Sequence, residues 1–505
     1  MTRLHHIARA MVLLAALSVY GCIPAPKGNL AWSPDGQTAL LLDGETLRFC
    51  DATGALVDGS LDAVVMAEWA GDDNRLLVMR RHALHHWARL APMIPQAQHE
   101  VVEQLAQRIK SHLLENVENL EAALGAEGKQ RLSELGLPDD MSTNDAALAL
   151  VWLFSHDAGD LAGKFGDAWR RPDDLSAEVY LVQMVRRGDA GVEVVRTVFA
   201  STRPAESLRV TRDGAHAAVV AESGAEDGRV ALYAVTLAEP GHVLIAPSVN
   251  RAPEWTNEQG ALIYTAPATP GVAPSAGAVR VLCRRSVRDA QGGLLDEMPE
   301  AEALAVVFFE QAQMLRTVPD APIFMALKDV RVPALPDEAI RGERVYRYLA
   351  GNKPALEPID NEALSTHMPD GIAAISVSPG GELIAMVDMK GRVCVLTRDG
   401  ALIVVQPDVV AAHSITHPSW RSERAMSLVL PAGHPAGRED RHAMAIWTAP
   451  PDTATYAPGT VHGIGEGDEG ARFTSISDGW PAGVGDSFLS IRQQKARADV
   501  SEGGR

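Results

Sequence analysis

Short apolar runs alternate with polar turns along most of this chain. The first instance is an apolar stretch that ends at Trp32, a turn at Pro34-Asp35-Gly36, and a second apolar run over residues 39–42. Proline fixes a negative φ and glycine accepts a positive one, so the chain reverses there at little energetic cost. The pattern predicts one β-strand that ends at Trp32 and a second that begins after the turn.

The same unit recurs further along the sequence. In each copy an anchor residue precedes the acidic or glycine residue of the turn by three positions, and a short apolar run follows. The six pairs are Trp32 with Asp35, Trp69 with Asp72, Val210 with Asp213, Trp255 with Glu258, Val377 with Gly380, and Trp420 with Glu423. Three spacings between anchors are short, at 37, 45 and 43 residues, and a period near 40 is that of a propeller blade. A single four-stranded sheet cannot bury both faces, so the pattern predicts blades packed around a ring.

The motif Trp-Ser-Pro-Asp-Gly at residues 32–36 resembles the hallmark of the WD40-like repeat in TolB-type β-propellers. Residues 377–381 and 211–214 match it in part, and the resemblance covers most of residues 29–460. It implies a mainly β fold and gives a set of repeat residues structural roles in blade packing and turn formation. These residues are Trp32, Asp35, Gly36, Trp69, Asp72, Asp213, Gly214, Trp255 and Trp420. It implies no particular activity, because propellers host many unrelated functions.

Two long gaps separate the visible copies, from residue 69 to 210 and from 255 to 377. The second gap contains strand-like apolar runs at residues 279–282, 305–309 and 345–349, which is room for one or two further blades. The visible and hidden copies together predict a propeller of six to eight blades, with seven favoured.

The first gap has a helical pattern. Apolar residues recur every three or four positions over residues 96–124 and mark one face of a helix. Shorter helices are predicted after it, so we expect a small α-helical subdomain inserted over residues 95–172. This is far longer than the usual connection of about 4–6 residues, and long excursions are often functional. Two interpretations remain open and are compatible: a cap packed on the propeller, or a docking element for a protein partner.

Residues 1–22 have the pattern of a targeting segment. A basic start precedes an apolar run over residues 10–17 that is too short to span a bilayer. The segment ends in Val19-Tyr20-Gly21-Cys22, which resembles the lipobox of bacterial lipoproteins and implies a lipid on Cys22. The alternative is a plain secretory signal. Only residues 23–28, at most about 20 Å of chain, precede the first predicted strand, so a lipid would hold the folded body close to the membrane.

Charge and cysteine content narrow the function classes. The chain has 505 residues and a formal net charge of −19. This acidity argues against nucleic-acid binding and against electrostatic attachment to anionic lipid. The four cysteines, Cys22, Cys50, Cys283 and Cys394, include no C-x-x-C pair, so no zinc site or redox motif is indicated. Cys50 and Cys394 lie in strand-like runs and are expected to be buried thiols, with a disulfide between them left open.

The sequence contains no recognised catalytic motif. G-x-S-x-G, a P-loop and H-E-x-x-H are missing, and no G-x-G-x-x-G follows a predicted strand. His82 and His86 share one face of a predicted strand, with His85 on the other, but residues four apart on a strand stand about 13 Å apart, too far to share a metal. His413 and His417 fail by the same spacing. We therefore expect no metal and no cofactor, and no catalytic residue is identified.

These inferences combine into one organisation. A signal peptide is expected over residues 1–22, two blades over 23–94, the helical insertion over 95–172, the remaining blades over 173–491 and a disordered tail over 492–505. We expect an exported protein, lipid-anchored to a bacterial membrane, that binds a protein partner or scaffolds an assembly in the cell envelope. The alternative is an enzyme acting on carbohydrate or peptide in the central funnel. A third interpretation is a lipoprotein whose helices only buttress the fold.

Overall fold

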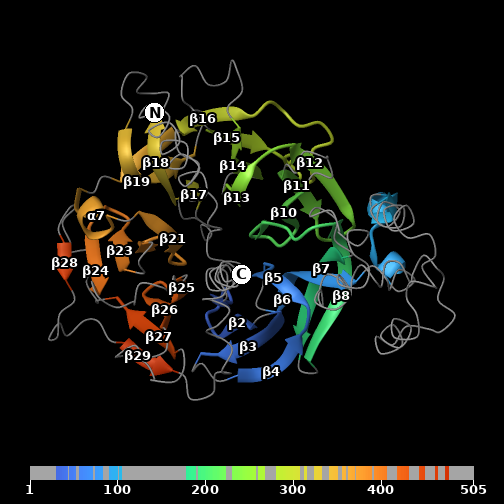
Figure 1. Cartoon of the computed structure of the whole chain (residues 1–505), viewed down its shortest axis with the longest axis horizontal. Helices are drawn as coiled ribbons and strands as arrows, with labels where there is room; N and C mark the ends of the chain where they lie inside the picture. Colours follow the sequence, from blue (N-terminus) through green and yellow to red (C-terminus); the bar gives the residue numbers. More distant parts are fainter. Residues whose placement is uncertain are drawn as a thin grey trace, which may run out of the picture.

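The strands of this chain form a ring of sheets around a central axis, as the computed structural model in Figure 1 shows. The structure describes residues 30–43, 45–52, 56–71, 74–83, 90–100, 102–104, 178–188, 191–222, 230–256, 260–267, 280–307, 312–314, 324–331, 340–350, 355–359, 362–369, 371–388, 392–406, 418–430, 443–449, 461–463 and 473–476. Six hydrogen-bonded sheets follow one another around the ring. The fold is therefore mainly β, in a six-bladed propeller arrangement.

The first three sheets are four-stranded antiparallel meanders. Sheet 1 consists of β1 (Leu30–Trp32), β2 (Thr38–Asp43), β3 (Thr46–Asp51) and β4 (Leu56–Leu61). Sheet 2 consists of β5 (Val64–Trp69), β6 (Arg75–Ala83), β7 (Glu178–Gly188) and β8 (Gly191–Ser201). Sheet 3 consists of β9 (Ser207–Val210), β10 (His216–Glu222), β11 (Val230–Thr236) and β12 (Gly241–Ala246). The first strand of each sheet lies nearest the ring axis (Figure 1).

Sheet 4 is larger, and it sets the blade count within the expected range of six to eight. Its eight strands are β13 (Asn250–Trp255), β14 (Ala261–Pro267), β15 (Arg280–Ser286), β16 (Glu302–Val307), β17 (Ala312–Met314), β18 (Phe324–Arg331), β19 (Ile340–Leu349) and β20 (Ala355–Ile359). The three strand-like runs of the second gap became β15, β16 and β19. The preference for seven blades is not supported, because β16 pairs with β18 at Val306 and Val307 and joins these strands into one sheet.

Sheet 5 has a short fifth strand that comes from the part of the chain that forms sheet 6. Sheet 5 consists of β21 (Ile372–Val377), β22 (Leu383–Asp388), β23 (Val393–Thr397) and β24 (Leu402–Gln406), and sheet 6 of β25 (Ser419–Ser422), β26 (Ala425–Leu430), β27 (Ala443–Thr448) and β29 (Phe473–Ile476). Between β27 and β29 the chain supplies β28 (Val461–Gly463), which pairs in parallel with the outer edge of β24. Residues 477–505, which include the predicted tail, lie outside the described residues.

Burial follows the position of each strand in its sheet. All six residues of β22 are buried, because a neighbouring sheet covers each face of this middle strand. The outermost strand β4 alternates exposed and half-buried residues. Apolar side chains fill the space between neighbouring sheets; Phe49 and Trp69, for example, meet between sheets 1 and 2 with ring centroids 6.4 Å apart. Packing between sheet faces therefore holds the ring together.

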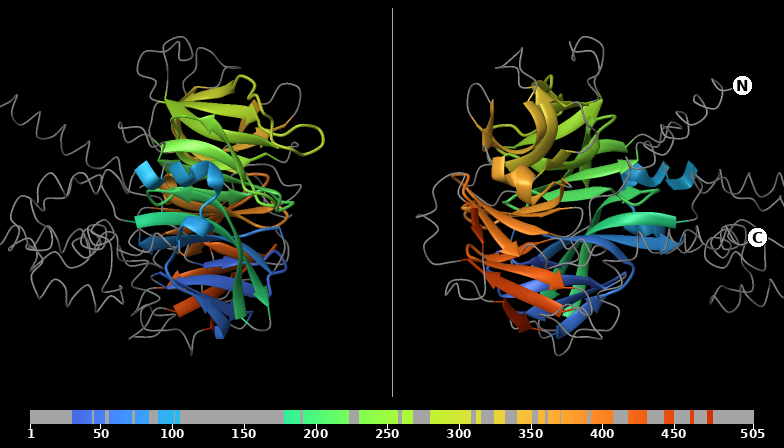
Figure 2. Two further views of the ribbon diagram at one scale, coloured as in Figure 1. Left: turned by 90° about the vertical axis from the view of Figure 1, so that its right-hand side faces the viewer. Right: turned by 60° about the vertical axis from the view of Figure 1, so that its left-hand side comes forward.

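The expected helical subdomain over residues 95–172 is not supported by the described residues. The α-helix that they delimit, α7 (Glu362–His367), lies between sheets 4 and 5. In the expected region the structure shows short helical turns, including η2 (Ala91–Met93) and η3 (Gln96–Gln98), beside β7 and β8 (Figure 2). Residues 105–177 lie outside the described residues, and so does most of that prediction.

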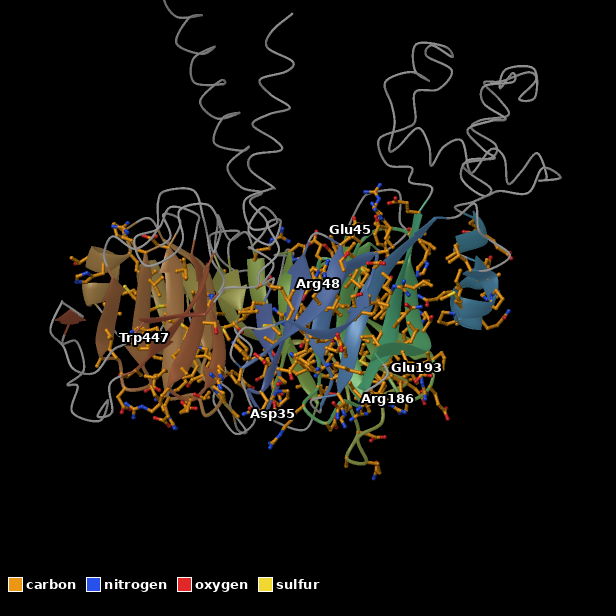
Figure 3. The ribbon with its side chains drawn as sticks, turned by 90° about the horizontal axis from the view of Figure 1, so that it is seen from below. Asp35, Glu45, Arg48, Arg186, Glu193 and Trp447 are labelled. Carbon is orange, nitrogen blue, oxygen red and sulfur yellow. The ribbon has the colours of Figure 1, made fainter. Side chains whose placement is uncertain are left out.

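The ring has two opposite faces, which we call the turn face and the excursion face. The turn face carries the tight turns that follow the innermost strands, with Asp35 at its edge in Figure 3. The excursion face lies opposite and carries Glu45, the end of β6 and the start of β7, and Leu30 is the end of β1 nearer to it. Ala83 and Glu178 are direct partners there, so residues 84–177 leave the hairpin and return to it at one point.

Candidate functional site

The repeat tryptophans connect neighbouring sheets. Trp69 and Trp255 each end an innermost strand, Trp420 lies within the innermost strand β25, and all three are buried. The indole Nε1 of each donates a hydrogen bond to a backbone carbonyl on the preceding innermost strand. The acceptors are Ala31 at 3.0 Å, Arg209 at 2.8 Å and Ser376 at 3.1 Å. Each indole thus ties one sheet to the sheet before it.

Trp32 makes the corresponding contact where the ring closes. Its Nε1 donates to the hydroxyl of Ser427 on β26 at 2.8 Å, and both residues are buried. The guanidinium of Arg421 lies 5.5 Å from the centroid of the Trp32 ring and donates from Nε to the Gly36 carbonyl at 3.2 Å. Sheets 1 and 6 therefore meet through side chains, and no described strand is shared between them.

Two of the predicted turn aspartates organise their own turns. Asp35 accepts hydrogen bonds from the Ser33 hydroxyl at 2.6 Å and the Gln37 amide at 2.9 Å. Asp213 accepts the same two bonds, from Thr211 at 2.6 Å and the Ala215 amide at 3.0 Å. The glycine after each aspartate, Gly36 or Gly214, has a positive φ of 68° or 64°. Asp72 lies outside the described residues.

In sheet 5 the aspartate position is occupied by Gly380, and a residue of the next sheet replaces its carboxylate. Glu423 accepts hydrogen bonds from the Ser378 hydroxyl, the Gly380 amide and, at 3.2 Å, the Glu382 amide. The Ser378 and Glu382 donors occupy the positions that serve Asp35 and Asp213 in their turns. The lost turn residue is thus compensated across the boundary between sheets 5 and 6.

Asp213 also links sheet 3 to sheet 4. Its second carboxylate oxygen accepts a hydrogen bond from Nη2 of Arg288 at 2.7 Å. Burial opposes ionisation, but the hydrogen bonds from Thr211, Ala215 and Arg288 outweigh it and lower the pKa of Asp213 to about 2. This carboxylate is therefore ionised throughout the neutral range.

Three charged residues on successive innermost strands form the candidate site nearest the ring axis. Arg209 on β9 lies between Glu68 on β5 and Glu254 on β13. Its Nη1 is 3.8 Å from Glu68 and its Nε is 3.4 Å from Glu254. Both carboxylates are buried, and Glu68 also accepts a hydrogen bond from the Val210 amide at 3.2 Å. One guanidinium serves both acids, so this cluster has the character of a structural bridge between sheets 2, 3 and 4.

A second charged cluster lies on the excursion face. Arg81 reaches Glu45 of sheet 1 at 2.6 Å and Glu178 of its own sheet at 3.5 Å. The Tyr180 hydroxyl donates to Glu178 at 2.8 Å, and burial together with this carboxylate raises the pKa of Tyr180. The neighbouring His82 is half-buried, and desolvation followed by the charge of Arg80 lowers its pKa to about 4. The cluster fixes the point from which residues 84–177 depart.

The start of that excursion is docked on the outer edge of sheet 2. The buried side chain of Gln98 donates to the Ala200 carbonyl at 2.8 Å and accepts from the Ala200 amide at 2.7 Å. An amide side chain thus satisfies both backbone groups of one residue on β8, as a further strand would. Leu90, Ile94 and Val102 are buried around it.

The cysteines and histidines that the sequence offered as candidates provide no reactive or metal-binding group among the described residues. Cys50, Cys283 and Cys394 are free and buried, as expected for Cys50 and Cys394, and burial raises their pKa to about 12, 11 and 12. These thiols are therefore poor nucleophiles at neutral pH. Cys22, His85, His86, His413 and His417 lie outside the described residues. Among the described residues, no group of three His, Cys, Asp or Glu side chains has the geometry of a metal site.

Sequence reasoning did not identify Glu68, Arg209 or Glu254. A signal exists, since each stands directly before the anchor of its repeat, at Trp69, Val210 and Trp255. It becomes visible only when the copies are aligned on that anchor. The contact between Arg81 and Glu45 has no such signal, because it joins residues of different sheets at no repeated position.

Within the described residues, no helix is long and apolar enough to cross a bilayer. No protein-family model matches the sequence, and no curated protein resembles it. The chain is similar in shape to the β-propeller domain of the trilobed protease from Pyrococcus furiosus, with 7% identity, 90% of this chain and 97% of that chain covered, and a TM-score of 0.41. It is also similar to the Cps50 (Swd1) propeller domain from Myceliophteria thermophila, with 10% identity, coverages of 81% and 94%, and a TM-score of 0.41. The fold described above rests on the strand order of this chain, which is that of a β-propeller.

Proposed function

We propose that this chain is an exported β-propeller, held at a bacterial membrane by a lipid on Cys22, that binds a protein partner or scaffolds an assembly in the cell envelope. One observation carries the binding role. Ala83 and Glu178 are paired in a single hairpin, so residues 84–177 form one excursion from its tip. Connections within a propeller are ordinarily a few residues long, and longer ones tend to serve binding.

The way the excursion is rooted supports this role. Arg81 ties its two ends to sheet 1 through Glu45 and Glu178, and Gln98 ties its first part to β8. Fixing a segment in place before it meets a partner lowers the entropic cost of binding. A passive loop needs no such attachment.

The enzyme alternative receives less support from the described residues. An acid and base pair requires two carboxyls whose environments drive their pKa values apart. Glu68 and Glu254 are instead both held by Arg209. We therefore propose the binding role. A small-molecule ligand found in a screen of the central funnel would favour the enzyme instead.

The binding role is tested with the full-length protein and a variant in which a short Gly/Ser linker replaces residues 105–172. The variant keeps residues 90–104, because Gln98 is part of the sheet 2 edge. After both proteins are shown to fold, each is cross-linked in detergent-solubilised envelopes. We expect a discrete partner with the intact protein only. Equal capture by both would move the binding site to the ring, and capture by neither would contradict the binding role.

The lipid anchor is tested separately. Cys22→Ala should release the protein from the membrane fraction while leaving its thermal unfolding unchanged. Retention of the variant in that fraction would contradict the anchor.

We also propose that sheet 4 comprises two blades, which would make seven. The four strands β17 to β20 form a meander of their own. One of its faces, with Met325 and Tyr346, packs on Ile263 and Leu282 of β14 and β15. Its other face, with Phe324, packs on sheet 5. Such face-to-face packing is how blades meet, and averaged electron-microscopy projections down the ring axis would show seven units or six.

A further inference from the structure

We propose that the excursion face of the ring lies against the lipid bilayer and that the turn face points away from it. This orientation rests on the lipid anchor of the proposed function and adds to it the surface that meets the membrane. The occupant of this face is a bilayer containing anionic lipid. A protein partner recognised at the same face would then lie at the bilayer surface.

The anchored chain enters the fold from the excursion side. β1 runs in the direction from the excursion face to the turn face, because Leu30 pairs with Leu41, nearer the turn that carries Glu45, and Trp32 pairs with Ala39, nearer the tight turn. Residues 23–29 span at most about 25 Å between Cys22 and Leu30. The lipid therefore reaches the fold from the excursion side.

The height of the ring makes the opposite orientation harder to reach with this tether. Six-residue strands such as β2 rise about 3.3 Å per residue, so the two faces are about 20 Å apart. Leu30 is level with Leu41, three residues from the start of β2, so a tether to a bilayer at the turn face would have to reverse direction after Leu30 and run back about 10 Å along the ring. Only about 15 Å of its length would then remain to reach the membrane.

The two faces also differ in exposed negative charge. The connection from β15 to β16 lies on the turn face, where Arg288 meets Asp213, and it exposes Asp296, Glu297 and Glu300. Anionic lipid repels such a group of carboxylates. On the excursion face, Arg81 is ion-paired with both Glu45 and Glu178, and Arg80 lies beside Asp62. The face nearer the tether is therefore also the one with less uncompensated negative charge in these described regions.

The experiment measures the distance of each face from the bilayer. The full-length protein is lipidated in a bacterial host and reconstituted in vesicles of phosphatidylethanolamine and phosphatidylglycerol with a headgroup-bound nitroxide quencher. A fluorescent amino acid replaces exposed Asp62 on the excursion face or, as the matched position, exposed Gln291 on the turn face. We expect several-fold stronger quenching at position 62. Inserting a long Gly/Ser linker between Lys27 and Gly28 should reduce this difference.

The outcomes separate the two proposals. Vesicle-bound protein that is quenched equally or more strongly at position 291 would overturn the orientation while leaving the anchor intact. Protein that does not bind vesicles, or that binds equally well as Cys22→Ser, would overturn the anchor and the orientation with it.

Discussion

The indole of Trp32 donates a hydrogen bond to the hydroxyl of Ser427, a residue of the last sheet. At three other boundaries between sheets the corresponding indole donates to a backbone carbonyl. Only where the ring closes does a side chain of the second strand provide the acceptor among these contacts. The indole contact at the closure therefore depends on the identity of one serine, whereas a backbone acceptor is present whatever the residue.

Replacing that serine should weaken the whole ring. Ser427→Ala leaves the buried Trp32 indole without its acceptor, which costs about 1–3 kcal/mol for a buried donor. We expect a lower midpoint in urea denaturation. Ser376→Ala is the matched control, because the Trp420 indole uses the backbone carbonyl of Ser376 and keeps it. Equal effects of the two substitutions would show that the hydroxyl does not hold the closure.

Moving the carboxylate from Glu423 of sheet 6 to position 380 in the turn of sheet 5 should preserve stability. Glu423→Ala removes the acceptor for Ser378 and Glu382 and should lower the free energy of unfolding by about 1–2 kcal/mol. Gly380→Asp restores a carboxylate at the position that Asp35 occupies in sheet 1. In the intact protein a new side chain there would crowd the Glu423 carboxylate. We therefore expect Gly380→Asp to rescue Glu423→Ala and to give no gain alone.

The measurement is a double-mutant cycle from denaturation curves of the four proteins. Additive effects of the two substitutions would mean that the carboxylate of Glu423 does not replace the missing aspartate.

Asp213 should make part of the stability depend on acid pH. Its pKa is lowered from 3.8 to about 2 in the folded protein, so the unfolded chain takes up a proton first as the pH falls. The contribution is fully present above pH 4 and is lost as the pH falls toward 2. Asp213→Asn should be less stable than the parent at pH 7, and the difference should shrink toward pH 2. A difference that stays constant across this range would exclude the carboxylate charge as the cause.

Gln98 should protect the outer edge of sheet 2 from solvent. In Gln98→Ala the backbone amide of Ala200 loses its partner, so we expect its hydrogen exchange to accelerate by about tenfold or more for a loss of about 1.4 kcal/mol in local protection. Gln96→Ala is the control, because Gln96 is exposed one turn away. Unchanged exchange at residue 200 would show that the side chain does not cap this edge.

The repeats made much of the fold predictable. Trp32, Trp69 and Trp255 end innermost strands and Trp420 lies on one, because the tight turn that follows each of these strands has a strong local sequence pattern. The blade count was not predictable by the same route. The pairing of Val306 and Val307 with β18 joins two meanders through only two residue pairs, and nothing local in either strand specifies it.

The charged clusters show a second limit of sequence reasoning. Glu423 reads as the acid of its own turn, in the alignment with Asp35. In the folded ring its side chain serves the turn of the preceding sheet, because the two turns lie side by side. Such exchange depends on how sheets stack and leaves no trace in spacing. The contact of Arg209 with Glu68 and Glu254 likewise depends on stacking.

Because side chains close the ring, the chain can begin and end at another boundary between sheets without dividing any sheet. No described strand before β13 pairs with any described strand from β13 onward. A circular permutant that begins at β13, ends at β12 and joins the present ends by a linker would therefore keep every sheet whole. In that molecule a peptide connection would span the boundary between Trp32 and Ser427, and the boundary between sheets 3 and 4 would rely on side-chain contacts, including those of Trp255, Arg209 and Arg288 and the apolar packing between the two sheets. Comparing the unfolding of the two topologies would measure how much of the cohesion of each boundary comes from the chain and how much from the contacts across it.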